Sequence, residues 1–597
     1  MPPPPQLNKQ QQHADTLRAA PPLVAIAPRP TPTPQPRQEI RLHAFEKFCL
    51  SRESSVDTRS SISHSLTGTF SSPCSSDDSR TAVPYVSPPL SVRTSTSPPV
   101  VVTTYDIYNL PPEPIVSQAI SSFYKMAATL WYVMTRDEAD EIQRSLYHAH
   151  FASQRSTPRL VEMCALASVG GQYHLDCPET QAVRRACMRT VKLYLDELLE
   201  ESELKAMRVN ELACLFHITD KRTSAWAYVA AGLRIAEHYG LENEIQRPSF
   251  NAAVPRIPEH EWMQYRKNWR TLRHLESWLA GTLGRFLPRS LHESINLSFL
   301  IDSTTKTNPH ATKIARNTNA IQCEFTKASI ISCELLRAAG SSIILNLPAL
   351  DPHIQKLDRW LQQLPEFMQL LYMIHHEDDV TVRNNSMLVH LVYLGARVIL
   401  ARRILVEKPS RVVKSMRMGG DQEHIDEGIK AACHVKTIVG MLLENKQLFK
   451  RCWLAIHESL SSASLLLYQA TQLFLMKKPY HELVDNARVL HQALDSCSKE
   501  DTVARSYHNL LQEFFDEFFN VNGIRGHVAI RRVDVMAHKL REVMRMPFDG
   551  PVNALVMGKE AATAGRYGNW LGARPIGGMG DAYTSRMPDG YGDVEMV

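Results

Sequence analysis

The 597-residue chain has little net charge, no closely spaced cysteines and no long uninterrupted apolar run. Its 67 basic and 62 acidic residues leave a formal charge of +5, too small to predict binding to nucleic acid or to a membrane surface by bulk electrostatics. The most apolar stretches, 328–350 and 388–400, contain charged residues and fall short of the ~20 apolar residues that span a bilayer. We therefore expect no membrane-spanning segment.

The eleven cysteines are scattered along the chain. An odd number without tight spacing is typical of free thiols in a reducing compartment, not of a disulfide framework. The amino terminus also lacks the charged and then apolar pattern of a secretory signal. These absences predict an intracellular protein.

Motifs for catalysis and metal binding are missing as well. No glycine-rich phosphate loop precedes a predicted helix, and no Gly-x-Ser-x-Gly motif occurs. Cys214 and His217 form a Cys-x-x-His pair without the second pair that a zinc site needs, so we interpret them as a core cysteine and a helix-capping histidine. The polar run 375–379 is interpreted as a solvated turn; a metal site is the alternative for both. We predict no enzyme, no metal and no cofactor.

Composition divides the chain into three parts. Residues 1–109 are rich in proline, serine and threonine and predict a disordered arm, because such a segment cannot offset the entropy of ordering. Residues 547–597 are glycine-rich and predict a disordered tail. Residues 110–546 have helical periodicity and few glycines. They predict one large all-α domain of about fifteen helices.

Four segments of this domain carry the clearest helical spacing. Their apolar residues are Val116, Ile120, Phe123, Ala127, Leu130 and Trp131; Val183, Cys187, Val191, Tyr194 and Leu198; Trp226, Val229, Leu233 and Ala236; and Ile354, Leu357, Leu361 and Leu364. Gly240 is predicted to end the third helix in a left-handed turn. The longest connections are expected at 242–258 and 410–422.

The most distinctive arrangement lies between residues 224 and 288, where two tryptophan-bearing helices are predicted. One face of the second helix is formed by Trp262, Tyr265, Trp269, Leu272, Glu276, Leu279 and Leu283. Glu276 is the only acidic residue on this apolar stripe, and a buried carboxylate is costly unless it is paired. We expect Arg234 and Arg285 to be its partners in an ion pair that fixes how the helices cross. Contact with a small ligand is the alternative role.

Taken together, these residues resemble a known family, the fungal-specific transcription factor domain, which is the all-helical middle homology region of binuclear zinc-cluster regulators. The motif residues that carry the resemblance are Trp226, Arg234, Gly240, Trp269, Glu276, Gly284 and Arg285. The likeness covers roughly residues 110–519. The chain departs from the family pattern in having Ser277 after the acidic residue, Arg270 after the tryptophan and Phe286 after Gly-Arg.

The resemblance implies a nuclear regulator of transcription that controls a fungal gene set, such as a metabolic pathway or gene cluster, through a helical regulatory domain. It also implies a coregulator or a small-molecule effector as a partner. The family reads DNA through a six-cysteine zinc module, whereas Cys49 and Cys74 are the only cysteines before residue 110. We therefore expect action through the transcription machinery or a DNA-binding partner, and direct DNA binding only if an upstream zinc-cluster exon is missing from this sequence.

Two further points stay open at the level of sequence. The family often dimerises through a coiled coil, but no sustained heptad precedes residue 110, so a homodimer is only weakly indicated. The alternative function is a helical scaffold or adaptor protein with no direct role in transcription.

Overall fold

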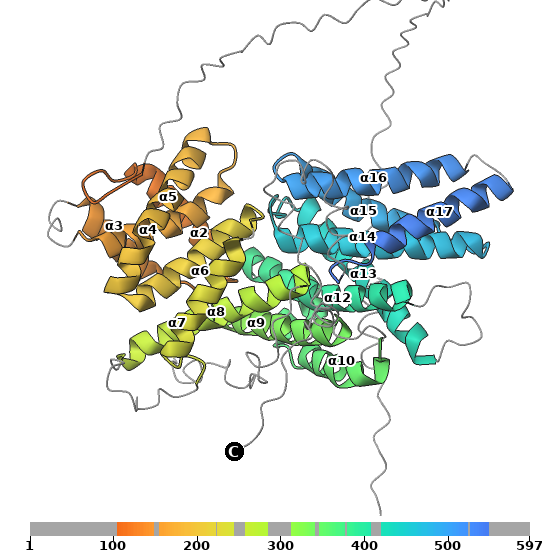
Figure 1. Cartoon of the computed structure of the whole chain (residues 1–597), viewed down its shortest axis with the longest axis horizontal. Helices are drawn as coiled ribbons and strands as arrows, with labels where there is room; N and C mark the ends of the chain where they lie inside the picture. The colour runs from red at the N-terminus through yellow and green to blue at the C-terminus, as the bar shows by residue number, and fades with distance from the viewer. Residues whose placement is uncertain are drawn as a thin grey trace, which may run out of the picture. The chain divides into compact units, whose positions relative to one another are not determined.

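The computed structural model describes residues 104–148, 155–222, 224–243, 257–284, 312–340, 345–375, 379–407, 419–522 and 526–548. Within these ranges the chain forms sixteen α-helices and no strand, which confirms the all-α prediction (Figure 1). Residues 1–103 and 549–597, most of the predicted arm and tail, lie outside the described residues.

The helices are numbered in chain order. The first eight are α2 (Glu113–Met126), α3 (Arg136–Tyr147), α4 (Thr157–Gly170), α5 (Pro178–Glu201), α6 (Glu203–Thr219), α7 (Ser224–His238), α8 (Glu259–Leu283) and α9 (Lys313–Gly340). The second eight are α10 (Leu347–Gln362), α11 (Leu370–His375), α12 (Val380–Glu407), α13 (Gly419–Glu444), α14 (Trp453–Leu475), α15 (His481–Ser498), α16 (Thr502–Asn522) and α17 (His527–Val543). Two short 3₁₀ turns are η2 (Gly171–Tyr173) and η6 (Glu366–Met368).

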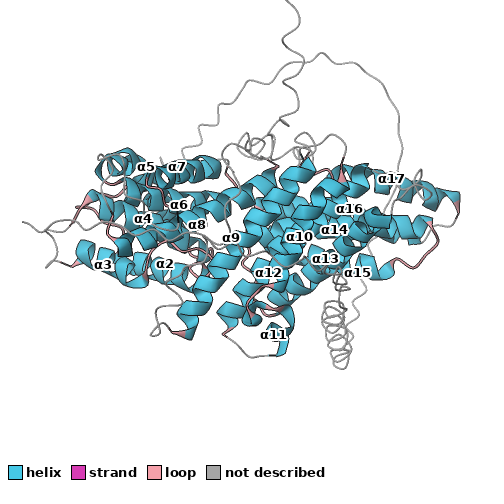
Figure 2. Ribbon diagram, turned by 90° about the horizontal axis from the view of Figure 1, so that it is seen from below, coloured by secondary structure: helices cyan, strands magenta, loops and turns pink. Residues whose placement is uncertain are grey.

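The helices pack mostly on neighbours in the chain. In the first helix group, α2 to α7, α4 packs on α2, α5 and α6, and α6 packs on α7. In the second helix group, α12 to α17, α14 contacts α12, α13, α15, α16 and α17. Helices α8 and α9 link the groups, because α8 packs on α7 and α9 packs on both α8 and α12 (Figures 1 and 2). All sixteen helices belong to one compact unit.

Helix α14 forms the centre of the second group. Every residue from Trp453 to Tyr468 is buried, because other helices surround this helix. Serines and alanines recur along it and allow close approach. Gly395 of α12 faces Glu458 of α14, and a Cβ atom at this position would displace the Glu458 carboxylate.

Local sequence signals account for several helix ends. Thr135 caps α3, since its Oγ1 accepts a hydrogen bond of 3.2 Å from the backbone N–H of Glu138. Gly240 ends α7 with φ of +66°, as predicted. The backbone N–H of Leu241 donates to the Ala236 carbonyl at 3.0 Å, which completes the hydrogen-bond pattern of a left-handed helix end.

The structure differs from the predictions at some boundaries. Helix α2 ends at Met126, and the predicted stripe continues through turns in which Ala127 and Leu130 are still buried. Helix α13 begins at Gly419, so it takes up part of the connection predicted at 410–422. Residues 244–256 of the other predicted connection lie outside the described residues.

Both ends of the described chain also extend past the predicted domain limits. The backbone N–H of Tyr105 donates to Thr190 Oγ1 of α5 at 2.8 Å, so residues 104–109, assigned to the arm from composition, are held on the first helix group. At the other end, Phe548 packs against the core and lies under the guanidinium of Arg403, 5.6 Å from it.

Candidate functional site

The two tryptophan-bearing helices lie side by side. Gly232 of α7 faces Leu272 of α8, and a Cβ atom at Gly232 would be 3.0 Å from two Leu272 methyl carbons. The missing side chain therefore allows the two helices to approach closely. Trp269 is buried in α8, whereas Trp226 is half-buried on α7. The predicted adjacency of these helices is confirmed.

The predicted stripe of α8 is buried along its whole length, and Glu276 is buried with it. Its Oε2 accepts a hydrogen bond of 2.6 Å from Nη1 of Arg273, one turn earlier on the same helix. Burial raises the pKa of Glu276, and Arg273 partly offsets that rise. The arginine three residues away thus supplies the charge that the apolar environment requires.

The predicted pair between Arg234 and Glu276 is wrong. Arg234 points to the surface of α7, with 68% of its side chain exposed, and binds Glu237 on the same helix at 3.1 Å. It follows Leu233, which packs inward, and one step along a helix turns the side chain by about 100° away from that face. The second predicted partner, Arg285, lies outside the described residues.

Gly284 closes α8 and receives the carboxy-terminal end of the described chain. Its φ is +65°, a left-handed conformation. A Cβ atom there would overlap the backbone carbonyl of Pro547, which follows α17. Gly284 is therefore required twice, by its own backbone angle and by the close approach of a distant segment.

A cavity of about 130 Å³ lies where the two helix groups meet. It is lined by the end of α2 and the turns after it, η2, the end of α6, parts of α8, α9 and α12, the end of α13, the α13–α14 connection and the start of α14. Most of its wall is apolar. The aromatic residues in the wall are Trp131, Tyr173, Trp278, Phe325, Phe449 and Trp453.

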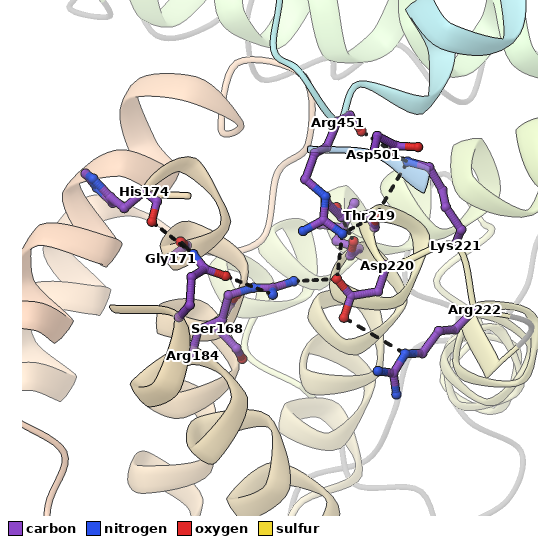
Figure 3. A network of polar contacts seen from close by, with 12 residues as sticks. Ser168, Gly171, His174, Arg184, Thr219, Asp220, Lys221, Arg222, Arg451 and Asp501 are labelled. Carbon is purple, nitrogen blue, oxygen red and sulfur yellow. Dashed lines mark hydrogen bonds and ion pairs between the residues drawn. The ribbon is translucent and has the colours of Figure 1, made fainter. Parts of the chain in front are cut away.

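One wall of this cavity adjoins a polar network that joins the two helix groups (Figure 3). Asp220, directly after α6, accepts hydrogen bonds from Arg184 of α5 at 2.9 Å and from Arg451 of the α13–α14 connection at 3.0 Å. Burial disfavours the charged form of Asp220, but the two guanidinium groups outweigh it and lower its pKa. Arg451 also donates to the Thr219 carbonyl at 3.1 Å.

Lys221 extends the network to a fourth segment. Its Nζ lies 3.0 Å from Asp501, which precedes α16, and 3.2 Å from the Arg451 carbonyl (Figure 3). Burial lowers the pKa of Lys221, and Asp501 partly restores it. The network therefore connects α5, the end of α6, the α13–α14 connection and the start of α16.

Among the residues that line the cavity, Trp131, Gln172 and Arg451 each have a buried polar atom without a hydrogen-bond partner in the described chain. These atoms are Nε1 of Trp131, Oε1 of Gln172 and Nε of Arg451. Gln172 is only 2% exposed. Buried polar atoms in native proteins are nearly always paired, so these two donors and one acceptor indicate hydrogen-bonding capacity that a bound molecule would use.

His274 adds a neutral polar group to the wall. Its Nδ1 lies 2.8 Å from Ser329 Oγ, which in turn donates to the Phe325 carbonyl, so Nδ1 carries the ring proton and Nε2 remains an acceptor. The ring stacks on Phe325 at 3.9 Å. Burial lowers the pKa of His274 to about 3, so the imidazole is uncharged at neutral pH.

The structure describes the first of the two histidine motifs found in the sequence in full and the second only in part. Cys214 is fully buried, as predicted, and His217 is buried beside it. The predicted capping role of His217 is wrong: neither ring nitrogen has a partner in the described chain, and the ring stacks on Tyr228 at 5.2 Å. Of the run 375–379, residues 376–378 lie outside the described residues.

The described part of the chain contains no group of three or more histidine, cysteine, aspartate or glutamate side chains placed to hold a metal ion. No helix within the described ranges is both long and apolar enough to cross a bilayer. The cavity and its polar wall were not found by sequence reasoning, because their residues come from distant segments. The charged triplet 220–222, which follows an apolar helix, was the one local sequence feature that pointed to the polar network.

Comparison with known proteins adds no identification. No protein-family model matches the chain, and no curated protein matches its sequence.

Proposed function

We propose that this protein is a nuclear regulator of transcription, in which the helical body of residues 104–548 controls the expression of a fungal gene set. Support comes from the residue pattern of α7 and α8, which resembles the fungal-specific transcription factor domain. Trp269, Glu276 and Gly284 of that pattern belong to a buried helix and its left-handed end, a framework consistent with the family's helical domain.

The observation that carries the proposal is the close pairing of α7 and α8 through Gly232 and Leu272. The motif runs through both helices, so those of its residues that the structure describes belong to one helix pair. With two cysteines before residue 110, the chain is proposed to act through the transcription machinery or a DNA-binding partner. An upstream zinc-cluster segment, sought by sequencing the 5′ end of the transcript, would add direct DNA binding.

The test tethers the full-length chain to a heterologous DNA-binding module upstream of a reporter gene, with the module alone as baseline. We expect a several-fold change in reporter output and nuclear enrichment of the tagged chain. Gly232→Val, which forces α7 and α8 apart, is expected to remove the effect. Arg234→Ala, an exposed change on the same helix, is the matched control and is expected to retain it.

The opposite result would favour the scaffold alternative. A tagged chain confined to the cytoplasm under all growth conditions, together with an unchanged reporter, would overturn the proposed regulatory function. Thermal unfolding of both variants shows whether Gly232→Val acts on the α7–α8 contact within a folded protein.

A further inference from the structure

The cavity between the helix groups has the size and chemistry of a ligand site. We propose that it binds a neutral, single-ring aromatic molecule that carries a hydroxyl group, a ligand of the phenol class. The proposal rests on three independent properties of the wall: its volume, its aromatic lining and its unpartnered polar atoms.

The volume limits the ligand to one ring. A cavity of about 130 Å³ is close to the engineered cavity of ~150 Å³ that accommodates benzene. Drug-sized ligands occupy pockets of roughly 300–1,000 Å³. A fused-ring compound or a nucleotide would therefore require the helix groups to separate.

The lining favours an aromatic ring over a polar metabolite. Trp278, Phe325 and Trp453 approach the cavity from α8, α9 and α14, so aromatic side chains come from three different helices. Aromatic pairs in offset or edge-to-face contact gain free energy beyond the burial of their surface. A sugar or amino acid would lose hydration against the apolar part of this wall.

The unpartnered atoms specify the hydroxyl group. Trp131 Nε1 and Arg451 Nε are donors, and Gln172 Oε1 is an acceptor. A hydroxyl accepts from one N–H and donates to one carbonyl, so a single group provides both kinds of partner. An unsubstituted ring would fill the space but leave all three atoms unpaired.

The charge of the site favours a neutral ligand. Arg451 already has Asp220 as its counter-ion at 3.0 Å, and His274 is neutral. Lys125, which also lines the cavity, is exposed to solvent. An anionic ring such as benzoate would thus lose hydration without a free buried cation to receive it.

Binding at this place would act on the contact between the helix groups. The cavity wall includes residues of both groups, and Arg451 belongs to the polar network that joins them. A ligand that contacts both groups stabilises their packed arrangement by mass action. The further step, that such a ligand changes transcription, rests on the proposed function.

The test measures binding of phenol, benzene and benzoate to the purified full-length chain, by ligand-observed NMR and by the shift in thermal midpoint. We expect saturable binding in the order phenol, benzene, benzoate, with a higher midpoint in phenol. Trp131→Phe keeps the ring and removes the donor, so it should weaken phenol binding roughly 2- to 10-fold, the range of one hydrogen bond. Trp226→Phe, outside the cavity, is the matched control and should bind phenol normally.

Leu388→Trp fills the cavity from α12 and should abolish binding, with unfolding in urea as the check that the variant is folded. Tighter binding of benzoate than of phenol would overturn the assignment of a neutral ligand. Absence of saturable phenol binding would overturn the site and leave the transcription proposal intact. Normal phenol binding with a reporter that does not respond to phenol would confirm the site and overturn its regulatory role.

Discussion

Lys221 and Asp501 form an ion pair of 3.0 Å in which both side chains are almost fully buried. Lys221 adopts a φ of +53°, an uncommon conformation for a residue with a side chain. Asp501 has a second role, because its Oδ1 accepts hydrogen bonds from the backbone N–H groups of Val503 and Ala504 and so caps α16. One carboxylate thus holds a helix start and the end of α6 together.

Replacing Asp501 should destabilise the protein more when both the ion pair and the helix cap are lost than when the cap is kept. Asp501→Ala loses both the charge and the cap and leaves Lys221 buried, so we expect a loss of roughly 3–5 kcal/mol in the free energy of unfolding. Asp501→Asn keeps an oxygen for the cap and should retain about 1 kcal/mol more. Urea denaturation measures both changes. A loss below about 1 kcal/mol for the alanine variant would contradict this role.

His217 should make stability depend on pH. Burial lowers the pKa of His217 to about 3. The nearby positive charges of Lys192 and Arg222 contribute to this lowering, and the negative charge of Asp220 opposes them. The unfolded chain takes up a proton near pH 6.5, so between pH 6.5 and about 3 the unfolded state binds more protons. The stability contributed by the neutral ring is complete above about pH 6.5 and is lost as the pH falls toward 3.

His217→Phe keeps a ring against Tyr228 and cannot be protonated. The difference in unfolding free energy between pH 7 and pH 5 should therefore shrink by roughly 2 kcal/mol in this variant. His238→Gln, an exposed change on α7, serves as control and should leave that difference as in the original chain. Urea denaturation at pH 5 and at pH 7 gives the unfolding free energies. The same change in unfolding free energy between the two pH values in the original chain and in both variants would refute the prediction.

Periodicity in the sequence was enough to predict the fold class and the inner face of α8. Every residue of the stripe from Trp262 to Leu283 is buried, because the 3.6-residue repeat places these side chains on one face. Arg273 was missed as a partner of Glu276 in favour of Arg234, although the three-residue spacing between Arg273 and Glu276 is itself a local signal for an ion pair. Predicting an ion-pair partner on a neighbouring helix requires knowing how α7 is rotated about its axis.

The cavity could not be predicted from the sequence. Arg451 and Asp220 are 231 residues apart, and each lies in a connection beyond the end of a helix. Helical periodicity does not indicate which of the connections between helices lie in contact in the folded chain. The unpartnered atoms of Trp131 and Gln172 also depend on the tertiary arrangement. In the sequence, a single tryptophan or glutamine gives no sign that its polar atom will be buried without a partner.

Gly284 and Gly240 give a matched pair of substitutions. Both have φ near +65°, but a new Cβ atom at Gly240 meets only the flexible side chain of Asn243 at 3.1 Å. Gly240→Ala should cost about 1–2 kcal/mol, the backbone strain alone. Gly284→Ala should cost more, because the new methyl group also displaces the backbone of Pro547.

Two measurements separate these effects. Urea denaturation gives the free energy of each variant, and limited proteolysis followed by mass spectrometry gives the cleavage rate after α17. We expect faster cleavage in Gly284→Ala alone. Equal free-energy losses with unchanged cleavage in both variants would mean that Pro547 does not depend on the surface at the end of α8.

The partner of Glu276 can be identified by a double-mutant cycle. Glu276→Leu removes the carboxylate beside Arg273, whose side chain is 7% exposed, so we expect a loss of roughly 3 kcal/mol. Arg273→Met with Glu276→Leu removes both charges and should recover most of that loss, giving a coupling of about 1–3 kcal/mol. The same cycle with Arg234→Ala should give a coupling near zero, because Arg234 is exposed and binds Glu237. A large coupling between Arg234 and Glu276 would mean that α7 is rotated in solution toward the arrangement expected from sequence.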